Sequence, residues 1–323
     1  MENTVSIYER ENRAIARADG KKRRFVLVTE SSLVIRTMTE DEVELAIDWA
    51  AKEGWNPGLH DGRCFWAADP QGFFIALEDG QPVGCVSAVR YGSDYAFLGF
   101  YVIKPSSRGK GYGLQLCKTA LDHVKGRVSG IDGVLAMQDK YSEPLAGDFW
   151  TGFQFAYSNI RFRGSYENRL DVKARGCHPE ISIVSAAVVD QTGLCDYDGS
   201  MFFAKRPEFL AQWLNQPESA ALAAVQNGKL TGYGVIRRCR EGHKIGPLFA
   251  DNGDAAEELF FHLAACANGE EVFLDVPEVN GAAMTLAAKY NMTKVFETAR
   301  MYNGPAPNLP LHKIFGVTSF ELG

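Results

Sequence analysis

Residues 97–113 read FLGFYVIKPSSRGKGYG, and the amphipathic stretch LQLCKTALDHVKG follows at once. An apolar run, a proline and a glycine-rich turn before a helical pattern predict a strand, a loop and a helix start, in that order. Glycines at 109, 111 and 113 leave the backbone bare, while Arg108 and Lys110 add positive charge. Backbone amides at such a turn and the positive end of the helix dipole attract a phosphate. The stretch therefore predicts a phosphate-binding turn within an α/β unit.

The spacing of these glycines excludes two common phosphate-binding loops. A Walker A loop needs Gly, four residues and then Gly-Lys-Ser/Thr, whereas Lys104 stands five residues before Gly109. A Rossmann fingerprint needs G-x-G-x-x-G, whereas the sixth residue from Gly109 is Leu114. The stretch instead resembles the acyl-CoA loop of the GNAT family of N-acetyltransferases, V-x-P-x-x-R/Q-G-x-G-x-G/A. The matching residues, with only the hydrophobic one displaced by a place, are Ile103, Pro105, Arg108, Gly109, Gly111 and Gly113.

Composition and charge narrow the class of protein. The chain has 323 residues, enough for two domains, and its 46% hydrophobic and 23% charged residues are typical of a globular protein. A net charge of −6 argues against nucleic acid as the main partner. The longest mainly apolar run, at 181–189, is too short to cross a bilayer, and the charged start at 1–14 lacks the apolar core of a signal peptide. We expect no membrane partner.

Cysteine usage predicts the compartment and the absence of a metal site. The seven cysteines are scattered and never spaced C-x-x-C, which is typical of reduced thiols in a cytoplasmic protein. His262 and Cys266 lie four residues apart on a predicted helix, but no second pair has matching spacing. We therefore expect these two side chains to pack rather than to bind a metal.

The chain repeats its own pattern. A hairpin pattern, strand, Asp-Gly or Asn-Gly turn and strand, recurs at a constant offset of 148 residues. The matched positions are Ala76, Gly80 and Gly84 with Ala224, Gly228 and Gly232. Later elements correspond in the same order, since LAMQ at 135–138 matches LDVP at 274–277. We predict two tandem α/β domains with mixed sheets. The expected parts are an N-terminal arm at 1–30, a catalytic GNAT domain at 31–165 and a second GNAT-like domain at 180–323.

The first domain is expected to follow the element order of the GNAT family. It would open with a strand at 34–37 and a helix that begins at a capping box of Thr39 and Glu42. The remaining elements are expected as a hairpin at 73–78 and 83–91, a strand at 96–103, a helix at 113–125, a strand at 133–138 and a final strand at 153–163.

The corresponding turn of the second domain, GPLFADNGDAAEE at 246–258, is acidic. Measured from the two prolines, Ala250 takes the place of Arg108 and Asp251 that of Gly109. A pyrophosphate beside these carboxylates would be repelled by about 1 kcal/mol per close pair in water and by more at lower dielectric. We therefore predict that the second domain has lost the cofactor. Its predicted role is to complete the substrate site, to stabilise the first domain or to form a homodimer.

The resemblance implies an N-acetyltransferase that carries an acetyl group from acetyl-CoA to a primary amine of a small molecule or peptide, by direct attack. In that family the strand before the loop splays from its neighbour to pair with the pantetheine arm. The resemblance gives the Val102 N–H the task of polarising the thioester carbonyl. The residues it assigns to the cofactor are Tyr101, Val102, Ile103, Arg108, Gly109, Lys110, Gly111, Tyr112 and Gly113. A non-catalytic acyl-CoA sensor is the alternative.

The catalytic acid departs from the family pattern. The family places a tyrosine four residues before the glycine of the last Gly-Phe, but Asp148 stands there. If the loop is longer in this chain, Tyr141 moves into that place, and we prefer it as the acid. Asp148 would need a large upward pKa shift by burial.

The base and the acceptor pocket are placed only by their position in the chain. Asp94, Glu53 and Asp61 are candidate bases, and each is also a candidate surface carboxylate. Trp55, His60 and Trp66 stand in the segment EGWNPGLHDGRCFWAADP at 53–70, where this family places substrate-selecting loops. These side chains either line the acceptor pocket or belong to the core.

Overall fold

The computed structural model describes residues 32–144, 152–166 and 178–323. The predicted arm at 1–30 lies outside these residues. The first half contains β1 (Leu33–Thr37), α1 (Glu40–Lys52), α2 (Asp61–Ala68), β2 (Phe73–Glu78), β3 (Gln81–Tyr91), β4 (Tyr95–Ile103), α3 (Tyr112–His123), β5 (Val128–Val134), α4 (Gln138–Ser142) and β6 (Gln154–Ser165). The second half contains β7 (Ile181–Ser185), α5 (Gln191–Met201), α6 (Pro207–Trp213), β8 (Ser219–Gln226), β9 (Lys229–Arg238), β10 (His243–Ala250), α7 (Gly253–Ala265), β11 (Glu271–Pro277), α8 (Gly281–Lys289), β12 (Thr293–Tyr302) and β13 (Ile314–Gly316).

The described strands form one mixed sheet, in the order β1-β2-β3-β4-β5-β12-β6-β11-β10-β9-β8-β7, with β13 pairing β10. Each half starts as an antiparallel meander and then adds one parallel pair, β4–β5 in the first half and β10–β11 in the second. This arrangement confirms the predicted mixed α/β sheet and the predicted repeat of elements. One detail of the prediction was wrong, because the strand expected at 133–138 lies at Val128–Val134.

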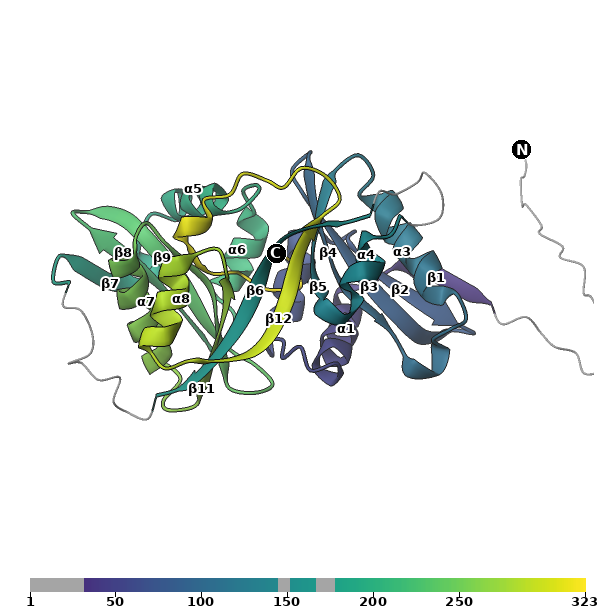
Figure 1. Ribbon diagram of the computed structural model, residues 1–323, viewed down its shortest axis with the longest axis horizontal. Coiled ribbons are helices and arrows are strands. Elements are labelled where there is room, and N and C mark those ends of the chain that lie inside the picture. Colours follow the sequence, from purple (N-terminus) through teal and green to yellow (C-terminus); the bar gives the residue numbers. More distant parts are fainter. Residues whose placement is uncertain (1–31, 145–151, 167–177) are drawn as a thin grey trace, which may run out of the picture.

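The two halves exchange their last long strands. The strand expected to close the first domain forms as β6, but it pairs with β11 of the second half, with Ser165 opposite Glu271. The place beside β5 is taken by β12, with Thr298 opposite Val134. Figure 1 shows β12 and β6 side by side between the two halves. Each half therefore depends on a strand from the other to complete its sheet.

Local signals in the sequence formed as predicted. The turn residues Asp79 and Gly80 have φ of +50° and +78°, and Asn227 and Gly228 have φ of +52° and +73°. Positive φ at both central residues is the geometry that favours Asp-Gly and Asn-Gly in two-residue hairpins. At the start of α1 the capping box of Thr39 is present as predicted. These turns and caps depend on neighbouring residues alone.

The helices divide the core into layers. Helices α1 and α2 of the first half face α5 and α6 of the second, and side chains of both halves share one apolar cluster. Within it Phe65 of α2 stacks on Trp213 of α6, with ring centroids 5.8 Å apart. Helix α3 packs on the other side of the first half, and α7 does so in the second. The shared cluster holds the two halves in one arrangement around the site described below.

Candidate active site

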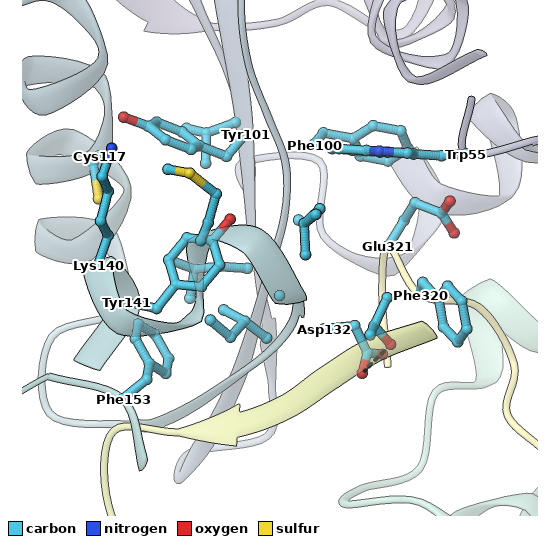
Figure 2. Close-up of a pocket in the computed structure, with 18 of the residues that line it drawn as sticks. Trp55, Phe100, Tyr101, Cys117, Asp132, Lys140, Tyr141, Phe153, Phe320 and Glu321 are labelled. Carbon is cyan, nitrogen blue, oxygen red and sulfur yellow. Dashed lines mark hydrogen bonds between the residues drawn. The ribbon is translucent and has the colours of Figure 1, made fainter. Parts of the chain in front are cut away.

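The parallel strands β4 and β5 pair over only half of their length. The pairing runs from Tyr95 opposite Val128 to Leu98 opposite Ile131, and beyond it the strands separate. A cavity of about 280 Å³ opens at this point, lined by residues of β4, β5, α3 and α4 together with β12 and the 311–323 segment (Figure 2). The predicted splay of β4 is thus present. It leaves backbone groups of β4 unpaired with β5, where a ligand's amides can bind.

A β-bulge sets the direction of β4 at the mouth of the splay. The register with β3 shifts between Cys85 and Ser87, and Phe100 adopts the left-handed region with φ of +48°. A bulky side chain in that region costs about 1–3 kcal/mol, and such strain gathers at functional sites. Bulges re-aim side chains and twist a strand, so this one directs β4 away from β5.

The direction of the backbone groups of β4 differs from the one that the expected role of Val102 requires. Val102 lies opposite Cys85 of β3, so its N–H points toward β3 and away from the cavity. The Lys104 N–H likewise donates to the Val83 carbonyl of β3, at 2.9 Å. Because successive residues of a strand direct their backbone groups to opposite sides, Tyr101 and Ile103 present theirs toward the splay. The geometry therefore favours these two residues, not Val102, for backbone contacts to a bound ligand.

The glycine-rich turn has the conformation its residues predict. Gly109 and Gly111 both have φ of +81°, and a Cβ built on either would meet no atom within 4 Å. Both face open space, and only glycine adopts this conformation at no cost. At position 113 glycine is required by space rather than by conformation, since a Cβ there would stand 2.5 Å from the Tyr101 hydroxyl. Gly111 also ends the loop as the residue before α3, so the first α3 amides point outward into the turn.

The basic side chains of the turn are held by carboxylates. Arg108 Nη2 donates to Glu53 at 2.9 Å, and its Nε donates to the Ile103 carbonyl at 2.9 Å. Lys110 Nζ lies 2.8 Å from a Glu78 oxygen, and this hydrogen bond raises the lysine pKa. The Tyr112 hydroxyl donates to the same carboxylate at 2.5 Å. Glu53, a candidate base from the sequence, is therefore a partner of the loop.

Tyr141 lies in the cavity, on helix α4. Its ring packs against Gly133 of β5, where a Cβ would stand 2.7 Å from a ring carbon. The Phe153 N–H donates to the Tyr141 carbonyl at 2.8 Å and anchors that end of α4. Burial raises the pKa of the tyrosine, which keeps its hydroxyl protonated as an acid requires. Asp148, the other candidate acid, lies outside the described residues.

The residues predicted for the acceptor pocket were Trp55, His60 and Trp66. Only Trp55 of these three lines the cavity, and Trp66 packs against the shared apolar cluster. Figure 2 shows Trp55 and Phe320 at one end of the cavity. Phe296 also lines the cavity, with its ring centroid 6.3 Å from that of Phe320.

His60 lies outside this lining, with its Nε2 3.2 Å from a Glu218 oxygen, and its role at the acceptor stays a prediction. Asp94, a candidate base, also lies outside the lining, and its role stays a prediction. It precedes β4 at the end where β4 and β5 still pair, and it is exposed.

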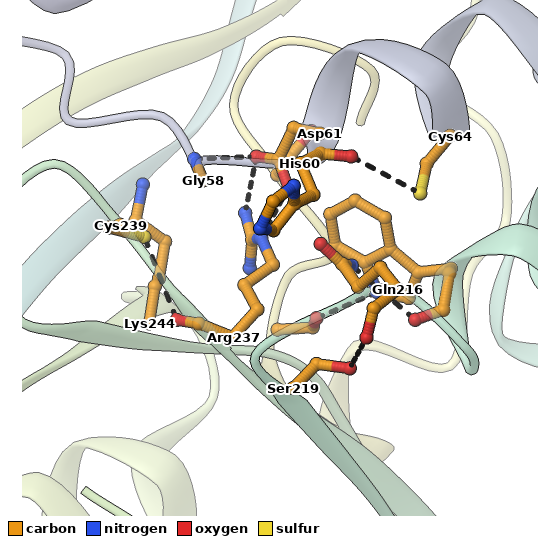
Figure 3. A network of polar contacts seen from close by, with 12 residues as sticks. Gly58, His60, Asp61, Cys64, Gln216, Ser219, Arg237, Cys239 and Lys244 are labelled. Carbon is orange, nitrogen blue, oxygen red and sulfur yellow. Dashed lines mark hydrogen bonds and ion pairs between the residues drawn. The ribbon is translucent and has the colours of Figure 1, made fainter.

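Asp61 serves the contact between the two halves. It binds Arg237 of β9 at 2.8 Å, and both side chains are fully buried (Figure 3). Its other oxygen accepts from the Gly58 N–H at 2.8 Å. Nearby, buried Lys244 donates to the Asn56 carbonyl at 2.9 Å. These contacts occupy Asp61, so the structure does not support it as a base.

Two acidic residues of the cavity escaped the sequence reasoning. Asp132 of β5 is held by Arg300 of β12 at 2.6 Å and by Asn159 at 2.7 Å. Glu321 is only 3% exposed, and neither of its carboxylate oxygens has a hydrogen-bond partner among the described residues. Burial raises its pKa. A glutamate between two apolar residues, Phe320 and Leu322, indicates a buried carboxylate. The sequence does not show that it lies in the cavity, because it is about 200 residues from the glycine-rich turn.

The second half has a splay of the same kind, and the chain itself fills it. The pairing of β10 and β11 begins with His243 opposite Val272 and ends with Ile245 opposite Leu274. Beyond that point β13 pairs with Leu248 and Phe249 of β10, while the Val317 N–H donates to the Asp275 carbonyl of β11 at 2.8 Å. The 314–317 backbone thus lies between the two strands. In the first half the equivalent space is the cavity.

The acidic loop before α7 binds side chains of this chain. Asp251 accepts from Lys313 at 3.0 Å, and Asn252 caps α7 by accepting from the Ala255 N–H at 3.0 Å. Aligned on the helix starts, Asn252 stands where Gly111 does, and Asp251 stands where Lys110 does. This differs by one residue from the alignment on the prolines, but the reversal of charge that it predicted remains.

Comparisons with known proteins agree with this geometry. The profile described as "Acetyltransferase (GNAT) family" matches residues 38–146, and the profile "Acetyltransferase (GNAT) domain" matches residues 194–316. The chain belongs to the GNAT family. It is a tandem member, and the proteins of this family are acyltransferases that use acyl-CoA. The resemblance stated from the glycine-rich turn is thereby confirmed.

Relatives of known name cover most of the chain. Holothin acyltransferase from Pseudoalteromonas sp. (strain SANK 73390) is 30% identical over 285 residues, which are 88% of this chain and 92% of that protein. A putative acetyltransferase from Pyrococcus horikoshii has a TM-score of 0.71 at 18% identity, over 92% of this chain and 98% of that one. A tandem GNAT protein from the clavulanic acid biosynthesis pathway has a TM-score of 0.57 at 14% identity, over 85% and 100%. The two structures show a shared fold.

Among the residues that the structure describes, no helix is long and apolar enough to cross a membrane. Within the same ranges, no three His, Cys, Asp or Glu side chains gather as a metal site would require.

Proposed function

We propose that the chain transfers an acetyl group from acetyl-CoA to a primary amine of a small molecule, by direct attack in the cavity between β4 and β5. The observation that carries this proposal is the position of the cavity. It begins where β4 leaves β5, and the glycine-rich turn before α3 follows at the end of the same strand. A ligand with a phosphate end and a narrow amide arm suits such a path.

Each part of the donor has matching residues. The turn at Arg108–Gly113 offers backbone amides to the pyrophosphate. Arg108 and Lys110 would contact it by exchanging their carboxylate partners, Glu53 and Glu78. Backbone groups of Tyr101 and Ile103 face the splay and suit the amides of the pantetheine arm. CoA would supply the activated thioester. Tyr141, buried in the cavity with its hydroxyl protonated, is the proposed acid for the departing thiolate.

The cavity favours a small apolar acceptor over a peptide. Trp55, Phe296 and Phe320 line it, and β12 and the 311–323 segment supply part of its wall. A volume of about 280 Å³ suits the acyl group and a compact amine. Because a 30% identical relative is named holothin acyltransferase, holothin is the first acceptor to assay. Aromatic and alkyl amines of similar size form the rest of the panel.

Release of free thiol from acetyl-CoA tests the proposal. We expect release that depends on an amine of the panel and yields one amide product per thiol, by mass spectrometry. Acetyl-CoA that binds in micromolar range without turnover over the whole panel would favour the alternative, an acyl-CoA sensor. Longer acyl-CoA donors in the same assay define the acyl preference.

A further inference from the structure

Residues 311–323 pass through both halves of the molecule. The segment begins beside α8, where Asn280 Nδ2 donates to the carbonyls of Leu311 and Ile314 at 3.1 and 2.9 Å. Lys313 then binds Asp251 of the acidic loop. The backbone from Ile314 follows the splay of β10 and β11, so this stretch lies where the second half would otherwise hold a pantetheine arm.

Beyond the splay the segment enters the first half. Arg206 of the second half donates through Nη2 to the Thr318 hydroxyl at 2.8 Å, and Tyr91 of the first half donates through its hydroxyl to the Leu322 carbonyl at 3.1 Å. The backbone at Glu321 runs along β4 so closely that a Cβ on Gly99 would stand 2.2 Å from the Glu321 carbonyl oxygen. Contacts on both sides therefore fix where the Glu321 side chain lies.

The Glu321 carboxylate lines the cavity, next to Trp55 and Phe320. Figure 2 shows it at the opposite end of the cavity from Tyr141. It is 3% exposed, and both of its oxygens lack a partner among the described residues. The other cavity carboxylate, Asp132, is already bound by Arg300 and Asn159. Glu321 is thus a buried acceptor with unused capacity in the wall of the cavity.

We propose that Glu321 is the general base of the acyl transfer, brought into the first cavity by a segment that occupies the cofactor cleft of the second half. This inference rests on the proposed function. The amine nitrogen forms a bond to the thioester carbon as the C–S bond breaks, and its proton passes to the Glu321 carboxylate. Tyr141 gives its proton to the departing thiolate. Glu321 then returns its proton to solvent, and Tyr141 regains one.

Several charged groups face Glu321 and set its pKa. Burial raises it, and Asp61 of α2 raises it further. Lys244 of β10, Arg161 of β6 and Arg237 of β9 lower it. Two of these cations are already paired, Arg161 with Asp275 and Arg237 with Asp61. Burial is the largest contribution, so the carboxylate has a pKa nearer to neutrality than an exposed glutamate, which suits proton transfer from an ammonium group.

The test is the pH dependence of kcat/KM for wild type and Glu321→Gln with an amine of the panel. We expect Glu321→Gln to lower kcat/KM by about 10²- to 10⁴-fold at pH 7, the range for loss of a general base. The rate of the variant should then rise tenfold per pH unit up to the pKa of the amine, because only free amine reacts. The rising limb of the wild-type pH profile of kcat/KM should lie at lower pH than that of Glu321→Gln. Acetyl-CoA affinity by calorimetry should not change.

Controls separate catalysis from folding. Since the Glu321 oxygens have no partner to lose among the described residues, Glu321→Gln should unfold at a temperature no lower than wild type. Glu321→Ala adds a second readout, recovery of rate with added formate, which a structural role would not give. Glu297→Gln, on β12 beside the cavity wall but paired with Lys294, is the matched control and should keep its rate within about twofold. 

Two results separate the inference from the proposed function. A wild-type rate and pH profile in Glu321→Gln, or no formate rescue of an otherwise slow Glu321→Ala, would overturn the role of Glu321 while acyl transfer stands. A wild-type protein that acylates no amine would instead refute the proposed function.

Discussion

Alanine at Gly111 tests whether the glycine-rich turn binds the donor. Gly111 has φ of +81°, and a Cβ there meets no atom within 4 Å, so the variant introduces conformational strain but no clash. A left-handed alanine costs about 1–2 kcal/mol. Reduced freedom of the unfolded chain offsets about 0.4–1 kcal/mol of this. The net loss of up to about 1.6 kcal/mol should lower Tm by at most a few degrees.

The same methyl group stands on the face that a phosphate would approach. We expect Gly111→Ala to weaken acetyl-CoA binding at least tenfold, about 1.4 kcal/mol, measured by calorimetry. Gly253→Ala is the matched control, because this glycine begins α7 with no atom within 4 Å of its Cβ and no positive φ. It should be neutral or slightly stabilising and leave affinity unchanged. Wild-type affinity in Gly111→Ala, or equal weakening in both variants, would refute the reasoning.

Three further predictions concern catalysis, stability and pH. Tyr141→Phe should lower kcat by about 10²- to 10⁴-fold with acetyl-CoA affinity intact, and full turnover across pH would remove this residue from the mechanism. Asp61→Ala should cost about 3–5 kcal/mol in urea unfolding, because Arg237 keeps a buried charge without its partner; a loss under 1 kcal/mol would contradict this. Hydrogen bonding from Arg36 lowers the pKa of Glu42 from 4.5 to about 2, so its stabilising contribution, present above pH 4.5, should be lost as pH falls toward 2. Glu42→Gln should remove that part of the acid sensitivity in thermal melts, and an unchanged pH dependence would argue against it.

Features set by neighbouring residues were predictable from the sequence. Positive φ at Gly109 and Gly111, the hairpin turns and the capping box at Thr39 each depend on a few adjacent side chains. The family resemblance rested on such a local pattern. The repeat supplied the remaining architecture, because two copies of one element order imply two copies of one fold.

Features set by distant contacts were not predictable. The exchange of β6 and β12 depends on pairing between strands more than 100 residues apart, for which the hydrophobic pattern is the same in either arrangement. The position of Asp94 at the paired end of β4 was not predictable, because closeness to β4 in sequence does not say which end of the strand opens. Glu321 was missed because its place depends on a segment that first passes through the other half.

The number of acetyl-CoA molecules bound per chain tests the central claim most directly. The first splay opens into a cavity beside a basic, glycine-rich turn, whereas the second holds residues 314–317 beside an acidic loop. Calorimetric titration of the full chain with acetyl-CoA should therefore give one site per chain, and that site should weaken in Gly111→Ala. Two sites of similar affinity, or one site that Gly111→Ala leaves unchanged, would contradict the account.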